Sequence, residues 1–175
     1  MNLITNPHAN DGLTGWTFNN VGDGWHITSR GHDDSTGFQG SYRRGTMWQT
    51  IDLLQYYDTA YLDTQPTIYY STWYRRYAYP DEFQNIITLY DFDGNVMHKE
   101  DTGVISVTSS NWNEYSWTFA DYGFGLREIR VTMASEDTEF WSGHYGAIID
   151  DVSLKLSCTL ISQTAYSLQS ESSYV

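Results

Sequence analysis

The chain has 175 residues, enough for one well-cored domain, and its 22 acidic side chains against 9 Lys and Arg give a formal net charge of -13. Such a surface repels phosphate backbones and anionic lipids, which excludes nucleic acid and membrane surfaces as expected partners. The sequence contains no run of 18 apolar residues, so we expect no membrane-spanning helix. Cys158 is the single cysteine, and the opening residues do not resemble a secretory leader, so we expect a cytoplasmic protein.

Alternation of apolar and polar residues with a period of two dominates the chain and predicts β-strands. There are five such runs, and in each of them the alternating residues share one face of the predicted strand. They are Ile68, Tyr70, Thr72 and Tyr74; Phe83, Asn85, Ile87 and Leu89; Asn113, Tyr115, Trp117 and Phe119; Ile129, Val131 and Met133; and Ile148, Asp150, Val152, Leu154 and Leu156. Turn signals such as Asp93-Gly94 separate them, and the one modest helical candidate, Leu53 to Leu62, is expected to be a short turn or loop. This pattern predicts an all-β, antiparallel β-sandwich or jelly roll.

A loop between two predicted strands carries two adjacent large aromatic residues, Phe140 and Trp141, within Glu136 to Ala147. A loop runs over the surface, where such residues are not needed for the core. An aromatic face covers the C–H side of a sugar ring while nearby polar groups take its hydroxyls. Two interpretations stay open: the pair binds a ligand, or it folds back and caps the end of a sheet.

The usual metal-site patterns do not fit. Asp91, Asp93 and Asn95 have the spacing of a calcium loop, but Gly94 comes too early, so a hairpin turn explains them better. The histidines are scattered along the chain without a paired motif: His8, His26, His32, His98 and His144. We therefore predict neither a metal site nor a cofactor.

Catalytic patterns are absent as well. Asp150 and Asp151 are neighbours on a predicted strand and are expected to point to opposite faces, so they could not act together on one glycosidic bond. No nucleophile elbow, phosphate loop or dinucleotide motif occurs in the sequence. We predict that the protein is not an enzyme.

The domain is expected to span residues 1–156. From Ser157 to Val175 serine, threonine and glutamine dominate without a sustained period, which predicts a mostly flexible tail.

Several blocks, in order and with similar spacing, resemble the F-box-associated domain, the substrate-binding half of the sugar-recognising F-box proteins. They cover roughly residues 2–156, and the blocks are Asn2 to Pro7, Gly12 to Trp16, Gly22 to Trp25, Gln49 to Leu53, Leu62 to Pro66, Trp73-Tyr74, Trp117 to Gly125 and Phe140 to Ala147. The resemblance implies a galactose-binding-domain-like sandwich of about ten strands. It also implies binding of the inner chitobiose of high-mannose N-glycans by loops at one end.

The resemblance also implies the site residues. Phe140 and Trp141 correspond to the aromatic pair that stacks on the sugar, Tyr42 to an aromatic from an earlier loop, and Asp81 to an acidic acceptor of a sugar hydroxyl. Ser142, where sugar binders usually have Lys, and His144, where an aromatic follows the glycine, depart from the family pattern. Both changes alter hydrogen bonding at the pocket and are expected to tune ligand choice.

Lectin-like binding of glycoprotein N-glycans is therefore the favoured function. A protein-interaction or adaptor domain of the same fold without sugar binding is the alternative, and a glycoside-acting enzyme is the third class. No F-box precedes Asn2, so we expect that recruitment of a ubiquitin ligase is not encoded in this chain.

Overall fold

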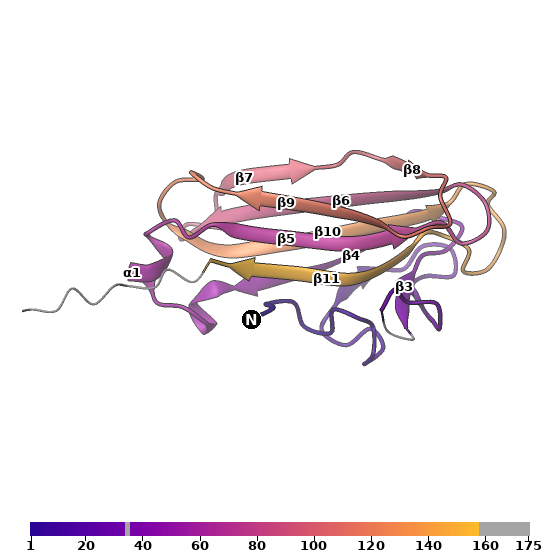
Figure 1. Ribbon diagram of the computed structural model, residues 1–175, viewed down its shortest axis with the longest axis horizontal. Coiled ribbons are helices and arrows are strands. Elements are labelled where there is room, and N and C mark those ends of the chain that lie inside the picture. The colour runs from indigo at the N-terminus through magenta and orange to yellow at the C-terminus, as the bar shows by residue number, and fades with distance from the viewer. Residues whose placement is uncertain (34–35, 158–175) are drawn as a thin grey trace, which may run out of the picture.

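The computed structural model describes residues 1–33 and 36–157, and these residues form two antiparallel sheets packed face to face (Figure 1). The prediction of an all-β antiparallel sandwich is confirmed. The predicted tail, apart from Ser157, lies outside the described residues. No helix in the described part of the chain is both long and apolar enough to cross a membrane.

Among the described residues, one sheet has six strands in the order β1-β4-β10-β6-β7, with β8 also paired to β6. The other has five strands in the order β2-β3-β11-β5-β9. The bounds in the first sheet are β1 (Thr17–Asn19), β4 (Gly45–Asp52), β6 (Asp81–Asp91), β7 (Val96–Asp101), β8 (Ile105–Val107) and β10 (Leu126–Asp137). Those in the second are β2 (His26–Thr28), β3 (Gly37–Gln39), β5 (Ile68–Arg75), β9 (Asn113–Phe119) and β11 (Ile148–Leu156).

The modest helical candidate becomes two short turns, η1 (Leu53–Gln55) and α1 (Thr59–Leu62). An aspartate caps each of them: Asp52 accepts from the backbone N–H of Leu54, and Asp58 from that of Tyr61. Each turn is too short to be stable by itself and is held by one buried leucine. The segment is therefore short, as expected, but it includes one α-helical turn.

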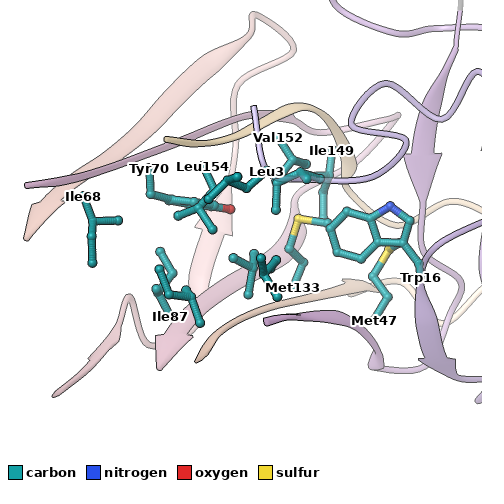
Figure 2. Packing of buried hydrophobic residues seen from close by; sticks show 14 of the residues in the cluster. Leu3, Trp16, Met47, Ile68, Tyr70, Ile87, Met133, Ile149, Val152 and Leu154 are labelled. Atoms are coloured by element: carbon teal, nitrogen blue, oxygen red, sulfur yellow. The ribbon is translucent and has the colours of Figure 1, made fainter. Parts of the chain in front are cut away.

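The core lies between the sheets and uses the faces that the alternation predicts (Figure 2). Ile68 and Tyr70 of one sheet meet Phe83, Ile87 and Met133 of the other in one cluster, all at most 2% exposed. The alternation in β5, β6 and β10 is thus explained by burial of one face of each strand.

A polar pair interrupts this apolar core. The Asn85 side-chain amide donates to the Tyr70 hydroxyl at 2.5 Å, and both residues are buried. Because a buried polar group without a partner destabilises the fold, the two residues fix each other's placement across the sheets.

The expectation that Asp150 and Asp151 point to opposite faces of β11 is wrong. The pairing of β11 with β5 shifts register between Asp150 and Ser153, and Asp151 has a φ of 50°. This β-bulge places one extra residue in the strand and breaks the period of two. As a result, both carboxylates lie against the same two histidines.

The aromatic loop joins β10 to β11 and lies at the end of the sandwich opposite α1 (Figure 1). The loop from β5 to β6 lies at the same end, because both β5 and β10 run toward it. The turns between β1 and β2 and between β3 and β4 come close to it as well, since they contact the aromatic loop through Asp23 and Ser41.

Candidate functional site

The two aromatic side chains of the β10–β11 loop point into solvent. Phe140 is 67% exposed and Trp141 is 57% exposed. Exposed rings do not cap a sheet, so burial of the sheet end does not account for this pair. Two adjacent exposed aromatic rings on one loop form an apolar surface that suits a flat ligand.

Asp137, the last residue of β10, holds this loop in shape. Its Oδ1 accepts from the backbone N–H of Glu139 at 3.0 Å, and its Oδ2 accepts from that of Trp141 at 3.1 Å. The backbone N–H of Asp137 donates to the Ser41 carbonyl oxygen at 3.0 Å. The resulting turn forces Phe140 to a φ of 56°, a left-handed conformation that a bulky side chain seldom adopts and that is frequent at ligand sites.

An apolar pocket of about 90 Å³ lies beside Trp141 and is lined by Ala78, Tyr79, Asp137, Trp141 and Tyr145. The ring centres of Tyr79 and Trp141 are 6.0 Å apart, and those of Trp141 and Tyr145 are 6.4 Å apart. This volume is well below the roughly 300–1,000 Å³ of ordinary small-molecule sites. The pocket can therefore hold only part of one sugar residue, with the rest of the ligand outside on the exposed rings.

Asp81 lies beneath this site. Its side chain is fully buried, and its Oδ2 accepts from the backbone N–H of Tyr77 at 2.7 Å, while its Oδ1 has no hydrogen-bond partner. Burial, helped by the neighbouring carboxylate of Asp137 and opposed by the Tyr77 hydrogen bond, raises the pKa of Asp81 to about 7. In this position Asp81 anchors the β5–β6 loop and is out of reach of a ligand.

Ser142 and His144 are tied to a different loop. Both Ser142 Oγ and the backbone N–H of Gly143 donate to Asp23 Oδ2, at 3.4 and 2.7 Å, and His144 Nε2 contacts the Asp23 carbonyl oxygen at 3.0 Å. The His144 ring also stacks on His26 at 4.6 Å. These side chains link the aromatic loop to the β1–β2 turn.

Tyr42 lies in the β3–β4 loop, half-buried, close to Gly22. No ring contact among the described residues joins Tyr42 to Phe140 or Trp141. Phe140, Trp141, Ser142 and His144 share one loop, whereas Tyr42 and Asp81 approach from neighbouring elements.

Sequence reasoning missed Tyr79, Tyr145, Asp137 and Asp23. Asp137 could have been found from the sequence, because an aspartate at the start of a loop often accepts hydrogen bonds from backbone N–H groups a few residues later and so forms a turn. Tyr79 could have been found too, as an aromatic residue in the predicted loop before Pro80. Asp23 could not, because its contacts are 119 to 121 residues away along the chain.

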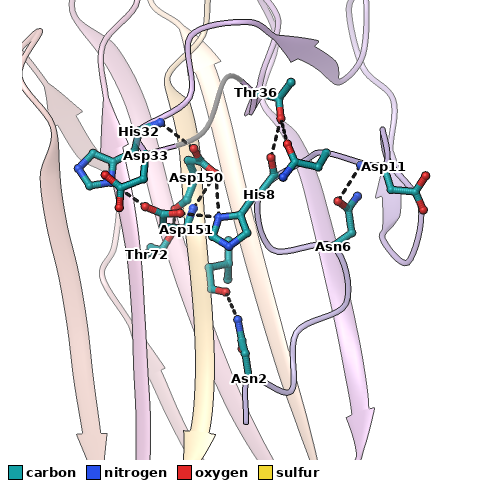
Figure 3. A network of polar contacts seen from close by, with 12 residues as sticks. Asn2, Asn6, His8, Asp11, His32, Asp33, Thr36, Thr72, Asp150 and Asp151 are labelled. Atoms are coloured by element: carbon teal, nitrogen blue, oxygen red, sulfur yellow. Dashed lines mark hydrogen bonds and ion pairs between the residues drawn. The ribbon is translucent and has the colours of Figure 1, made fainter.

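A second polar cluster forms at the β11 bulge (Figure 3). Asp151 bridges two histidines, with Oδ1 at 2.5 Å from His8 Nδ1 and Oδ2 at 2.6 Å from His32 Nδ1. The fully buried Asp150 accepts from the backbone N–H groups of His32 and Asp151, both at 2.7 Å. Burial raises the pKa of Asp150 to about 6. Histidines that are scattered along the chain are therefore brought together by folding.

The ligand atoms of this cluster form two sets, His8, Asp150 and Asp151, and His32, Asp33 and Asp151. Within each set the atoms lie within 4.8 Å of one another, a spacing that a metal ion could bridge. Both Asp150 oxygens accept from backbone N–H groups and Asp151 Oδ2 is hydrogen-bonded to His32 Nδ1, whereas Asp151 Oδ1 meets His8 Nδ1 as an ion-pair contact, so the cluster also serves as a polar link. This link ties the N-terminal segment and the β2–β3 loop to β11.

Three larger depressions lie elsewhere. One of about 320 Å³ lies on the outer face of the six-stranded sheet and includes Trp48 and Tyr56. Another of about 510 Å³ lies beside Phe92, near the β6–β7 hairpin. A third of about 210 Å³ lies on the five-stranded sheet and includes Tyr69 and Trp117. None of them brings several exposed aromatic rings together as the β10–β11 loop does.

Comparison with known proteins decides the family, because the F-box associated region matches residues 1–156 of the chain. The chain belongs to the F-box associated region family. The resemblance predicted from the sequence blocks is confirmed.

Two curated relatives of this F-box associated region are longer proteins. F-box only protein 2 of Bos taurus is 30% identical over 172 residues, which cover 87% of this chain and 58% of the relative. F-box only protein 6 of Homo sapiens is 28% identical over 172 residues, which cover 89% of this chain and 59% of the relative. The chain thus spans less than two thirds of the length of these relatives.

Solved structures share the fold. TmCBM61 in complex with β-1,4-galactotriose superposes with a TM-score of 0.62 at 14% identity, covering 90% of this chain and 99% of that one. The second family 16 carbohydrate-binding module gives a TM-score of 0.60 at 19% identity, covering 88% and 99%. An enzymatically active domain of a bacteriophage CBA120 tailspike protein gives 0.64 at 18% identity, covering 89% and 21%. At these identities the likeness concerns the fold.

Proposed function

We propose that this F-box associated region is a lectin-like module that binds N-linked oligosaccharides of glycoproteins, of the inner chitobiose and high-mannose type. Trp141 and Phe140 provide the stacking surface. The observation that supports this proposal most is that both rings are exposed on a loop whose shape is fixed by the buried carboxylate of Asp137. A preformed apolar surface loses little conformational entropy when a ligand binds.

The groups around the rings fit a sugar. Tyr79 and Tyr145 extend the apolar surface on either side of Trp141 and carry hydroxyls that can bond to sugar hydroxyls. Ser142 is exposed and offers a further hydroxyl, so it is expected to tune specificity together with His144. In this proposal Asp81 acts by holding the β5–β6 loop, and Tyr42 contributes from the rim of the site.

The comparisons support binding of sugars in general more than any particular glycan. The family is one whose sugar-recognising members the sequence blocks resemble, and the TmCBM61 structure contains a bound galactotriose. Recruitment of a ubiquitin ligase forms no part of this proposal. The cytoplasmic location expected from the single cysteine stays a prediction.

The main alternative is a protein-interaction domain of the same fold, in which Phe140 and Trp141 contact a polypeptide. Catalysis is disfavoured, because Asp150 and Asp151 are engaged by histidines and backbone N–H groups and Asp150 is inaccessible. We therefore expect no turnover of a glycoside.

A glycan array probed with the purified chain tests the proposal. Binding confined to structures that contain the chitobiose core supports it, and binding to no oligosaccharide would favour the protein-interaction alternative. Incubation with chromogenic glycosides tests the enzymatic class separately, and release of the chromophore would contradict a binding-only role.

A further inference from the structure

Three aromatic rings form a row in space that leads away from the pocket. Trp141 is followed by Tyr145, with ring centres 6.4 Å apart, and Tyr145 by Tyr77, with ring centres 5.6 Å apart. Each step is comparable to the length of one monosaccharide in an oligosaccharide. The ring planes are inclined to one another by 79° and 54°, so the three rings form a stepped aromatic surface from Trp141 to Tyr77 that a chain of sugars could follow.

This surface ends at a pair of arginines. The Arg30 guanidinium carbon lies 4.7 Å from the centre of the Tyr77 ring, and Arg75 Nη2 donates to the Arg30 carbonyl oxygen at 3.0 Å. The Arg75 guanidinium carbon in turn lies 4.8 Å from the centre of the Trp112 ring. Stacking on aromatic faces holds both guanidinium groups in place while leaving N–H donors in their planes available.

Neither guanidinium is neutralised by a described carboxylate. Among residues 1–33 and 36–157, the arginines that form ion pairs are Arg44 and Arg127, not Arg30 or Arg75. Glu114, which pairs in register with Trp73 on the neighbouring strand, is not within ion-pair distance of Arg75. Burial and the nearby charge of Arg30 lower the pKa of Arg75, as expected for two cations held together.

This arrangement is unusual for a chain with a formal net charge of -13. At physiological ionic strength the Debye length is about 8 Å, so distant acidic groups are largely screened and the local arginines dominate at short range. A small anion placed here would gain charge-assisted hydrogen bonds from guanidinium N–H groups other than the Arg75 Nη2–H that donates to the Arg30 carbonyl oxygen.

We propose that Arg30 and Arg75 form an anion subsite at the end of the aromatic surface, so that the preferred oligosaccharide carries a carboxylate, sulfate or phosphate group on a residue beyond the one stacked on Trp141. This inference rests on the proposed glycan-binding function and adds that, among glycans with the chitobiose core, those that also carry an acidic group are preferred. Arg30 and Arg75 are specificity-determining residues in this view, and the aromatic pocket supplies the common part of the affinity.

The test compares matched oligosaccharides by calorimetry: one neutral and the same one bearing sialic acid, a sulfate ester or a phosphate ester. We expect the wild-type chain to bind at least one acidic form about tenfold more tightly than the neutral form. Comparison of the sialic acid, sulfate ester and phosphate ester forms shows which anion the subsite binds. The preference should fall as salt is raised, because exposed charges are screened, whereas neutral binding should change little.

Three variants assign the effect. Arg30→Gln removes an exposed charge and should abolish the preference for the acidic form over the neutral form, and Arg30→Lys should retain part of it. Arg75→Gln should act in the same direction, with thermal unfolding recorded because this side chain is half-buried. Arg130→Gln, on the outer face of the other sheet over Tyr90, makes the same change in net charge and should leave the preference intact.

The outcomes separate the two proposals. If neutral and acidic forms bind equally well, or if Arg30→Gln keeps the preference, the anion subsite is wrong and the glycan-binding function stands. If no oligosaccharide binds in any arm, the proposed function itself fails and the subsite fails with it.

Discussion

The carboxylate of Asp137 accepts a hydrogen bond from the backbone N–H of Trp141 at 3.1 Å, so a buried acid at the end of β10 fixes an exposed aromatic residue of the β10–β11 loop. Its other oxygen accepts from the backbone N–H of Glu139. The position of the Trp141 ring is therefore determined from within the sandwich, although the ring itself lies in solvent.

Replacing Asp137 by Asn should weaken both ligand binding and the fold. The amide has one acceptor oxygen in place of two, so one of the two loop hydrogen bonds is lost. We expect glycan affinity to fall about tenfold and the free energy of unfolding to fall by ~1–2 kcal/mol, as for loss of one hydrogen bond to a charged group. Asp93→Asn in the distant β6–β7 hairpin is the control and should change neither quantity.

Because of Asp81, the free energy of unfolding should fall as the pH rises toward neutrality. Its pKa is about 7 in the folded state, against 3.8 for the ordinary group, so the folded state holds this proton to higher pH than the unfolded state does. The free energy of unfolding should fall between about pH 4 and pH 7 and level off above. Asp150, with a pKa of about 6, acts in the same direction over a narrower range.

Asp81→Asn isolates this contribution, because the amide mimics the protonated acid and can still accept from the Tyr77 N–H. Denaturant unfolding at several pH values should show a smaller decline for the variant between about pH 4 and pH 7. If the free energy of unfolding declines equally in the two proteins, the pKa of Asp81 in the folded protein is not raised.

The hydrogen bond between the buried residues Tyr70 and Asn85 should contribute measurably to the free energy of unfolding. Tyr70→Phe removes the acceptor of the Asn85 amide in the core, which leaves a buried donor without a partner. We expect the free energy of unfolding to fall by ~1–3 kcal/mol. Tyr69→Phe, one residue earlier and 48% exposed, is the matched control and should have no measurable effect in the same denaturant titration.

Glycan binding should not need a metal ion. The residues around Trp141 do not belong to either set of ligand atoms at the β11 bulge. Treatment with a chelator should leave the affinity unchanged, even if it lowers the melting temperature through the His8, Asp150 and Asp151 cluster. Loss of binding in chelator that calcium restores would contradict this expectation.

The sandwich was predictable because burial of one face imposes a period of two on strands such as β5 and β6. The same rule failed at Asp151, where a bulge adds a residue to β11, and a local backbone conformation of that kind leaves little trace in composition. The exposed pair Phe140 and Trp141 could be found from its place in a loop. The contacts of Asp23 could not, since they depend on how distant loops meet.

The affinity of Trp141→Ala for the glycan that the array identifies decides whether the ligand lies on the β10–β11 loop. It is measured beside the affinity of Trp48→Ala, with the thermal unfolding of both variants. Trp48 lines the depression on the outer face of the six-stranded sheet and represents a competing binding surface. We expect Trp141→Ala to keep the wild-type melting temperature and to lose at least ~2 kcal/mol of binding free energy, more than tenfold in affinity, and we expect Trp48→Ala to bind as the wild type does. Wild-type affinity in folded Trp141→Ala, or loss of binding in Trp48→Ala alone, would contradict the placement of the glycan on the β10–β11 loop.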